Sequence, residues 1–288
     1  MKFSIITVCY NAKNHIEKTI KSVVGQDFAD YEYIIVDGGS TDGTCEIIEK
    51  YAKAADSGDN KGLAIRYISE KDEGLYDAMN KGFSMAAGDY IEFLNAGDEL
   101  FDSQTLTTVS GIIDSVCKTA GTGDCAGKRD SSESMYIFYG NIVYKNSDGS
   151  EDVRLYGKSC GKPIYFATGD CVNHQAIFAQ RGALVQKSEH EKPFRFGEFS
   201  ICADRDWMMR ATKLGAIWAP LNATVVKYDL AEESISVRDK ALLRAEERKC
   251  LKKNYPVMLP IYVMFDFCRN NKTLSKLLHK IYEILYIR

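Results

Sequence analysis

The chain has no hydrophobic run that could span a bilayer, no signal segment and no excess of basic residues. An apolar stretch from Pro256 to Cys268 is interrupted by Pro260 and is too short for a spanning helix. The N-terminus enters a predicted strand at Phe3 without a preceding signal segment, which predicts a cytoplasmic protein. A net charge of -3, without a basic stripe interleaved with aromatic residues, argues against nucleic-acid binding.

Two common binding motifs are also missing. The nine cysteines include no Cys-x-x-Cys pair, so the sequence offers no recognisable zinc site. An odd number of cysteines without a secretory signal favours reduced thiols. Cys9, Cys45, Cys250 and Cys268 lie within apolar patterns and are expected to pack in the core. The dinucleotide fingerprint Gly-x-Gly-x-x-Gly does not occur either.

Apolar strands and amphipathic helices alternate through the first hundred residues. Predicted strands cover residues 3–10, 33–36, 63–68 and 90–94, and the segments between them repeat apolar side chains at helical spacing. Continuous apolar strands are typical of a buried parallel sheet. The pattern therefore predicts an α/β fold with a mostly parallel, doubly wound sheet and helices on both faces.

Acidic and small residues follow two of these strands. Asp37 opens the turn DGGSTDG after the second strand, and Asn95 to Asp98 follow the fourth strand. Open α/β sheets bind ligands at the carboxyl ends of their strands, and an oxygen-rich turn there suits a hard divalent cation that carries phosphate. The alternative for each turn is purely structural, as a cap of the next helix or a solvated loop.

The order and spacing of these motifs resemble the family 2 glycosyltransferases with a GT-A fold over about the first hundred residues. The forms NAGD and DEGLYDAMNKG look most like a bacterial branch that builds surface polysaccharides, the colanic-acid-type transferases. The residues that carry the resemblance are Ser4-Ile5-Ile6-Thr7-Val8 with Tyr10-Asn11, the run Ile35 to Gly43, Asn80-Lys81-Gly82, Gly88-Asp89-Tyr90-Ile91 and Asp98.

The resemblance implies a role for each matching residue in the nucleotide-binding half, residues 1–100. Thr7 and Tyr10 would border the nucleotide of a nucleotide-diphosphate sugar, with a UDP-sugar favoured. Asp37 would bind uracil or another base, and Asp72 would contact the nucleoside. These four residues are therefore the expected binding site for the nucleoside.

The resemblance also implies a divalent cation, Mn²⁺ or Mg²⁺, that bridges the donor diphosphate. Asp98 would hold this metal. Asn95 and Gly97 occupy positions that are often Asp in the family, so the usual acidic set is incomplete. Asn95 could still offer a carbonyl oxygen to the donor site, but the metal is expected to bind more weakly than between two carboxylates.

The acceptor half is expected over residues 135–230. His174, in the segment NHQAIF, resembles a segment near the donor pyrophosphate or sugar, although a lone histidine before an apolar run is more often structural. The resemblance assigns Asp204 as the catalytic base, with Arg210 supporting its helix. Asp206 is the nearest competitor, but it lies two residues further along, which turns it about 200° around the helix.

Three further segments carry expectations. Residues 118–134 have no apolar period and are expected to form a surface loop. The segment Asn146 to Ser150 predicts a hairpin between strands over 136–144 and 151–156. A helical C-terminal extension is expected over 231–288, beyond a GT-A domain of residues 1–230. Its last helix, over residues 273–287, either packs on the domain or lies peripherally in the inner face of a membrane.

Three functions remain open at this point. The first is an inverting transfer of a sugar from a nucleotide-diphosphate donor to a hydroxyl of a saccharide or lipid-linked acceptor. The second is a sugar-phosphate nucleotidyltransferase, which is disfavoured because Tyr10-Asn11 replaces a glycine-rich, basic triphosphate loop after the first strand. The third is a nucleotide-sugar binding protein without turnover.

Overall fold

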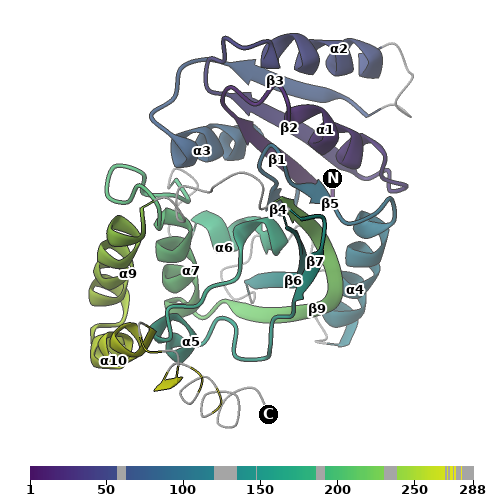
Figure 1. The fold of residues 1–288 in the computed structure, drawn as a ribbon. Helices are drawn as coiled ribbons and strands as arrows, with labels where there is room; N and C mark the ends of the chain where they lie inside the picture. Colours follow the sequence, from purple (N-terminus) through teal and green to yellow (C-terminus); the bar gives the residue numbers. More distant parts are fainter. Residues whose placement is uncertain are drawn as a thin grey trace.

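The protein forms an α/β structure around one large sheet (Figure 1). Residues 120–134 of the predicted loop over 118–134 lie outside the described residues, and so does most of the predicted helix over 273–287. Lys118 and Thr119, where the predicted loop begins, are the last residues of α4 (Thr105–Thr119). The computed structural model describes residues 1–56, 63–119, 135–146, 148–185, 192–229 and 239–269, and the single residues 271, 273, 274, 276 and 280.

The first half of the sheet consists of four parallel strands in the order β3-β2-β1-β4. Because the chain reverses direction across the sheet after β3, right-handed crossovers place α3 on the face opposite α1 and α2. The predicted α/β architecture is confirmed. Its elements are β1 (Phe3–Cys9), α1 (Ile16–Val24), β2 (Tyr31–Asp37), α2 (Thr44–Asp56), β3 (Ile65–Ser69), α3 (Leu75–Met85) and β4 (Tyr90–Phe93).

The second half of the sheet is mixed, and its strands β8 and β9 are not evident from sequence periodicity. The strand β8 runs antiparallel to both β4 and β6, and β9 runs parallel to β6. The long strand β9 contains Pro220 and a left-handed Asn222 with φ 51°, and its pairing with β6 changes register. These irregularities break the period-two pattern that would have predicted it. The elements are β5 (Glu99–Leu100), α4 (Thr105–Thr119), β6 (Tyr136–Lys145), β7 (Glu151–Arg154), α5 (Pro163–Ala167), η1 (His174–Ala176), β8 (Ile177–Gln180), α6 (Arg181–Val185), α7 (Ala203–Lys213) and β9 (Ile217–Asp229).

The predicted hairpin is confirmed. The strands β6 and β7 pair antiparallel, with Lys145 opposite Glu151 and Ile142 opposite Arg154. The second strand ends at Arg154, two residues before the predicted end.

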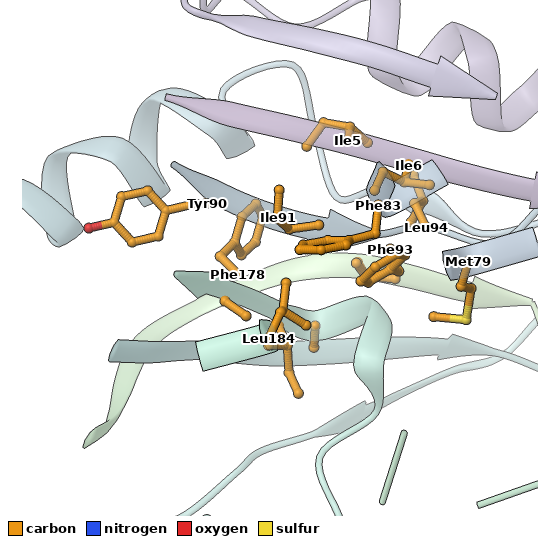
Figure 2. Packing of buried hydrophobic residues seen from close by; sticks show 14 of the residues in the cluster. Ile5, Ile6, Met79, Phe83, Tyr90, Ile91, Phe93, Leu94, Phe178 and Leu184 are labelled. Carbon is orange, nitrogen blue, oxygen red and sulfur yellow. The ribbon is translucent and has the colours of Figure 1, made fainter. Parts of the chain in front are cut away.

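The core between the sheet and α3 is closely packed. Figure 2 shows Met79 and Phe83 of α3 lying near Phe93 and Leu94 of the β4 segment. A Cβ atom added at Gly82 would lie 2.4 Å from Cγ2 of Ile6, so a glycine is needed where α3 crosses β1. This close crossing fixes the start of α3, which carries two residues of the site described below.

The C-terminal helices pack on the second half of the protein. They are α9 (Lys240–Asn254), η2 (Pro256–Met258) and α10 (Leu259–Arg269). In Figure 1, α9 and α10 lie beside α7 and α5, away from β2 and β3. Among the residues that the structure describes, no helix combines the length and apolar character needed to cross a membrane.

The cysteines behave as expected with two exceptions. Cys9, Cys250 and Cys268 are buried free thiols. Cys117 is disulfide-bonded, so the expectation of reduced thiols is wrong for this residue. Cys45 is only partly buried, and its Sγ lies 3.2 Å from Oδ2 of Asp37, which makes it part of the DGGSTDG turn rather than a simple packing residue.

Glu92 is a buried carboxyl in the middle of the sheet. It is fully buried, and neither of its carboxyl oxygens has a hydrogen-bond partner among the described residues. Burial, with a smaller contribution from the nearby Asp98 carboxylate, holds the pKa of Glu92 well above its ordinary value. Glu92 is therefore protonated and neutral in the folded protein around neutral pH.

We expect Glu92→Gln to stabilise the protein at alkaline pH. Above the ordinary glutamate pKa of about 4.3, Glu92 releases its proton on unfolding, so rising pH lowers the free energy of unfolding of the natural protein. The variant has no such carboxyl to titrate. The difference in the free energy of unfolding between the variant and the natural protein should therefore grow by about 1.4 kcal/mol for each pH unit above the ordinary glutamate pKa. Urea unfolding between pH 5 and pH 8.5 measures it, with the exposed Glu46→Gln as the control. A difference that does not change with pH would contradict a buried neutral carboxyl.

Candidate active-site cleft

A cleft of about 1,100 Å³ opens at the carboxyl ends of β1 and β4. Tyr10 and Asp72 line one end, and Tyr144 and Arg154 line the other. Side chains from α3, η1, α7 and α9 complete the walls. This is the position at which open α/β sheets bind ligands, because neighbouring helices diverge there.

Tyr10 and Asp72, which the sequence predicts to lie beside the nucleoside, line the same cleft, and their part of it is here called the nucleotide end. The side chain of Tyr10 is 65% exposed, so its ring is open to stacking. Oδ1 of Asp72 accepts a hydrogen bond from the backbone of Gly74 at 2.9 Å, which fixes the carboxylate beside Tyr10. A Cβ atom at Gly38 would lie 2.4 Å from Oδ2 of Asp72, so only glycine leaves room for this carboxylate.

Thr7 and Asp37 do not line the cleft. Thr7 is fully buried, because alternate residues of β1 face opposite sides of the sheet, and its hydroxyl lies 3.0 Å from the Tyr33 hydroxyl. The carboxylate of Asp37 is also fully buried and accepts hydrogen bonds from the backbone of Gly39 at 3.0 Å and from the Ser69 hydroxyl at 2.7 Å. The structure thus places Asp37 inside its own turn, where it holds the backbone beneath the nucleotide end.

These hydrogen bonds keep Asp37 ionised. Burial raises the pKa of Asp37, but the bonds from the hydroxyls of Ser40 and Ser69 outweigh this effect, so the pKa lies below its ordinary value. The turn is also tied to β1, since the Asn11 backbone donates to the Ser40 hydroxyl at 2.7 Å. Asp37 therefore organises the two strand ends on which the nucleotide end depends.

The turn from Asn95 to Asp98 forms the floor of the cleft. Gly97 has φ 103°, a left-handed conformation that favours glycine and would strain an aspartate at this position. The Thr19 hydroxyl accepts from the Gly97 backbone at 2.9 Å and donates to the Asp98 carbonyl at 2.7 Å. The α1 helix thus fixes the turn, and Gly97 is a requirement of that backbone.

Asp98 is 5% exposed and lies at the bottom of this floor. Its Oδ2 accepts a hydrogen bond from Nε2 of Gln175 at 3.1 Å. Burial raises the pKa of Asp98 to about 7, although the Gln175 bond and the charge of Lys18 lower it. The charge of Lys18 therefore offsets only part of the effect of burial.

The donor atoms fit a metal that is shared with a ligand. Oδ1 of Asn95 is buried without a hydrogen-bond partner among the described residues, so it and the Asp98 carboxylate are two oxygen donors on one turn. No cluster of three or more His, Cys, Asp or Glu side chains that could hold a metal occurs in the described part of the chain. Mg²⁺ and similar ions are commonly held by one or two carboxylates with substrate phosphates as the remaining ligands. The residues fit that arrangement.

Asp204 lies in the first turn of α7 and lines the cleft. Its Oδ1 lies 2.9 Å from the hydroxyl of Tyr76 on α3, and its Oδ2 lies 3.1 Å from Nδ1 of His174. Nε2 of His174 lies 3.2 Å from Nδ2 of Asn95. The structure thus brings together three of the predicted site residues, Asn95, His174 and Asp204, in one connected chain.

The electrostatics of Asp204 keep it charged. Burial raises its pKa, but the hydrogen bonds from His174 and Tyr76 outweigh burial, so the pKa of Asp204 lies below its ordinary value. The positive end of the α7 dipole acts in the same direction. Asp204 is therefore an ionised carboxylate at the cleft wall.

Asp206 has a different environment. It is fully buried and accepts hydrogen bonds from Nε of Arg210 at 2.9 Å and from Nδ2 of Asn254 at 2.9 Å. Arg210 also donates to the Pro193 carbonyl at 2.6 Å. Asp206 and Arg210 thus join α7 to α9 and to the preceding loop, and Asp206 does not line the cleft.

Two glutamates of α9 hold the start of α7, and the sequence pattern does not reveal them. The Glu246 carboxylate accepts from the backbone of Ser200, Ile201 and Cys202 at 2.8–2.9 Å. Glu247 forms a buried ion pair with Arg205 at 3.0 Å. Since these contacts flank Asp204, the C-terminal extension takes part in shaping the cleft; the contacts arise from residues more than forty positions apart and leave no local signal.

The sequence also misses the residues at the far end of the cleft. Tyr144, Arg154, Asp170 and Tyr228 line it, and Nη2 of Arg154 lies 3.5 Å from Oδ1 of Asp170. Aromatic rings with neighbouring charged groups are common in pockets that orient polar ligands. Their positions depend on β6, β7 and β9, whose pairing the sequence did not fully predict.

Residues 4–114 match the model of the family described as Glycosyl transferase family 2. The chain is a glycosyltransferase whose residues 4–114 resemble the family 2 glycosyltransferases. A PGL/p-HBAD biosynthesis glycosyltransferase of Mycobacterium bovis is 29% identical over 208 residues, which cover 72% of this chain and 68% of that protein. The putative teichuronic acid biosynthesis glycosyltransferase TuaG of Bacillus subtilis is 33% identical over 120 residues, which cover 42% of this chain and 45% of that protein.

Solved structures agree on the GT-A fold. TarS of S. aureus, residues 1–349 in complex with UDP-GlcNAc, superposes with a TM-score of 0.65 at 17% identity over 94% of this chain and 74% of that one. The chain spans 40% of the longer TarS chain. The mannosyltransferase PcManGT of Pyrobaculum calidifontis, in complex with GDP-Man and Mn²⁺, has a TM-score of 0.51 at 16% identity and covers 98% of this chain and 80% of that one. The glycosyltransferase is therefore the one of the three predicted classes that holds.

Proposed function

We propose that the enzyme is an inverting glycosyltransferase that moves a sugar from a nucleotide-diphosphate sugar to a hydroxyl of a saccharide or lipid-linked acceptor. The observation that carries the proposal is the ionised Asp204 at the wall of a cleft whose other end presents Tyr10 and Asp72. A cleft of about 1,100 Å³ exceeds the upper range of about 1,000 Å³ for small-ligand pockets, which leaves room for a donor and part of an acceptor.

The proposed donor is a UDP-sugar. An exposed Tyr10 ring offers a stacking surface for a base, and Asp72 offers acceptor oxygens to a ribose or base. The UDP-GlcNAc complex of TarS, which shares this fold, supports the same donor class. In this proposal Asp37 acts by holding the turn beneath the nucleoside.

The reaction is a single displacement. The acceptor oxygen forms a bond to the anomeric carbon of the donor sugar, and the bond from that carbon to the diphosphate oxygen breaks. The acceptor proton passes to the Asp204 carboxylate, and the nucleoside diphosphate leaves with the bonding electron pair. Asp204 is suited to this role because it is ionised before the reaction begins.

A divalent cation would be held by Asp98, with Asn95 as a second oxygen donor. When bound, such a cation neutralises charge on the departing diphosphate. The Mn²⁺ in the PcManGT complex supports a divalent cation in general. The Thr19 contacts to the Asn95–Asp98 turn keep its backbone in place for that role.

The proposed pathway is the synthesis of a cell-surface polysaccharide, of the colanic-acid type suggested by NAGD and DEGLYDAMNKG. The relatives named for teichuronic acid and PGL/p-HBAD biosynthesis support a surface glycoconjugate as the product class. We place the enzyme at the cytoplasmic face of the membrane, where a lipid-linked acceptor would be found.

The exposed face of α10 supports a membrane contact through the C-terminal helices. Val263, Met264 and Phe267 are 46–75% exposed and recur at helical spacing on α10, and Val257 of the preceding η2 is 77% exposed. The helix has one acid, Asp266, which is 6% exposed and paired with arginines of α9, so the apolar face carries no negative charge. Such a face next to basic residues is typical of helices that lie in a membrane interface.

The size of this face argues for a bilayer over a second copy of the chain. Eleven residues form a helix roughly 16 Å long and about 10 Å wide, on the order of 160 Å². Stable protein interfaces bury about 800 Å² on each partner. The exposed Lys252 and Lys253 at the end of α9 complement anionic headgroups beside the apolar face.

We expect Asp204→Asn to retain donor binding and to lose transfer by roughly a hundredfold or more, because a positioned base contributes at least that much. The assay mixes UDP-GlcNAc and other nucleotide sugars with an organic extract of the source membranes, and measures free nucleoside diphosphate and sugar in the organic phase. Asp206→Asn is the matched control. It should lower the free energy of unfolding, while the folded variant keeps its turnover rate. Near-native turnover of Asp204→Asn would remove the proposed base. Release of pyrophosphate in a separate reaction with UTP and a sugar 1-phosphate would indicate a nucleotidyltransferase.

We expect Mn²⁺ to stabilise the protein mainly when UDP is present, because the chain supplies few metal ligands itself. In thermal unfolding, the shift with both should exceed the sum of the separate shifts, since each bound ligand adds to the free energy of unfolding. Asp98→Asn should lose the Mn²⁺-dependent part and keep the shift caused by UDP in chelator. Asp72→Asn should reduce the shift in thermal unfolding that UDP causes in the presence of chelator. A full Mn²⁺ effect in Asp98→Asn would overturn the assignment of Asp98.

We expect Phe267→Asp to weaken binding to vesicles that contain anionic lipid by roughly tenfold or more, since burying a Phe side chain contributes about 1.5–3 kcal/mol. Leu155→Asp is the matched control, because Leu155 is 73% exposed and Phe267 is 75% exposed. Vesicle co-sedimentation measures the binding, and rising salt should weaken it. Equal binding by the two variants would contradict the α10 face, and a concentration-dependent dimer lost only in Phe267→Asp would assign it to a second copy.

A further inference from the structure

The two oxygens of Asp204 have unequal numbers of hydrogen-bond partners. Oδ1 accepts from the backbone of Arg205 at 2.8 Å and lies 2.9 Å from the hydroxyl of Tyr76. Oδ2 has one partner, Nδ1 of His174, at 3.1 Å. A carboxylate oxygen has two lone pairs, so Oδ2, which has a single partner among the described residues, keeps one acceptor position.

His174 has its own orienting contact. Nδ2 of Asn95 lies 3.2 Å from Nε2 of the imidazole, and an amide nitrogen can only donate. Nε2 is therefore the acceptor, and the imidazole proton resides on Nδ1, where it donates to Asp204. The side chain of His174 is 11% exposed, so the ring lies within the wall of the cleft between Asn95 and Asp204.

Tyr76 holds the other side of the carboxylate. It is 4% exposed, and its ring packs on Phe194 with centroids 5.5 Å apart. The Asn80 side chain donates to the carbonyl and accepts from the backbone nitrogen of Phe194, at 2.8 and 3.0 Å. The hydroxyl of Tyr76 also lies 2.5 Å from the Ile201 carbonyl, so α3 is tied to the segment just before α7.

We propose that His174 is a positioning residue that fixes Oδ2 of Asp204 as the atom that receives the acceptor proton, and that couples this atom to the donor-side turn through Asn95. The inference rests on the proposed transfer reaction and assigns a role to His174 beyond the donor contact implied by the resemblance. With Tyr76 and the Arg205 backbone on Oδ1, the carboxylate cannot rotate without breaking bonds on both oxygens. The free lone pair of Oδ2 is thereby kept available to the acceptor hydroxyl.

The proton balance of the step is simple. The acceptor O–H bond breaks as the bond from oxygen to the anomeric carbon forms, and an O–H bond forms at Oδ2. His174 keeps its Nδ1 proton throughout the step. The diphosphate carries away the electron pair of the broken bond, so no further reactant is needed.

Two substitutions separate the contacts of His174. The amide nitrogen of Asn can occupy the position of Nδ1, so His174→Asn can keep the bond to Asp204 and lose the contact with Asn95. The amide nitrogen of Gln reaches the position of Nε2, so His174→Gln can keep a contact with Asn95 and lose the bond to Asp204. We expect His174→Gln and His174→Ala to lower kcat on the order of tenfold to a hundredfold, the usual effect of a hydrogen bond to a charged group. His174→Asn should retain more activity than His174→Gln, and the KM for UDP-GlcNAc should change little in each.

The pH dependence of kcat is a measurement that a purely structural role of His174 would leave unchanged. The titratable groups that face Asp204 are His174, Tyr76 of α3, Cys171 before η1 and Cys202 before α7. Burial raises the pKa of Asp204, and the hydrogen bond from His174 contributes most to lowering it. Without that donor the pKa rises, the base stays protonated to higher pH, and the acid limb of kcat moves upward.

The experiment measures kcat and KM between pH 5 and pH 9 with UDP-GlcNAc and the membrane extract, and thermal unfolding of each variant. An upward shift of the acid limb in His174→Gln and His174→Ala, and a smaller shift in His174→Asn, is the expected result. Equal activity losses in the Asn and Gln variants, without a shift of the limb, would overturn the inference. Asp204→Asn in the same assay separates the two proposals. If Asp204→Asn is inactive and the His174 variants show none of the expected effects, only the role of His174 is wrong. If Asp204→Asn is active, Asp204 is not the base and the proposed reaction is wrong.

Discussion

The contact between Tyr76, Asp204 and His174 joins the two halves of the protein. Tyr76 belongs to α3, which packs on the parallel strands, whereas Asp204 begins a helix of the second half. His174 extends the chain to Asn95 on the floor of the cleft. Because every member is buried or nearly so, each hydrogen bond is strengthened by the low local dielectric, and each missing partner would be costly. The relative position of the two halves of the protein at the cleft depends on these hydrogen bonds.

The C-terminal helices are part of the same construction. Glu246 accepts three backbone hydrogen bonds at the start of α7, and Glu247 pairs with Arg205 next to Asp204. The Glu246 carboxylate lies at the positive end of the α7 dipole and satisfies the backbone N–H groups of Ser200, Ile201 and Cys202, which immediately precede the helix. A division at residue 230 therefore separates the helix that carries Asp204 from the groups that hold it, although the sequence places a boundary there.

The parts of the site that depend on interactions between residues close in sequence could be predicted, and those that depend on residues far apart in sequence could not. The parallel strands, the turns after β2 and β4, and the hairpin of β6 and β7 come from local periodicity and turn residues, and the sequence predicts them. The carboxylate of Asp37 could not be placed, because its inward orientation is set by Ser69 on another strand. Glu246 had no signal, since its role depends on an element more than forty residues away. The irregular β9 hid the residues that line the far end of the cleft.

The proposed membrane contact lies close to one wall of the cleft. Leu243 and Glu247 of α9 line the cleft, and α10 packs on α9 through the buried Tyr262, whose hydroxyl donates to Glu247 at 2.6 Å. The same helix exposes Val263 and Phe267 on its outer side. If α10 lies in a bilayer interface, its neighbour α9 brings one wall of the cleft close to the headgroups. A saccharide carried on a lipid could then reach Asp204 without leaving the membrane, which makes a lipid-linked acceptor the simplest match to this geometry.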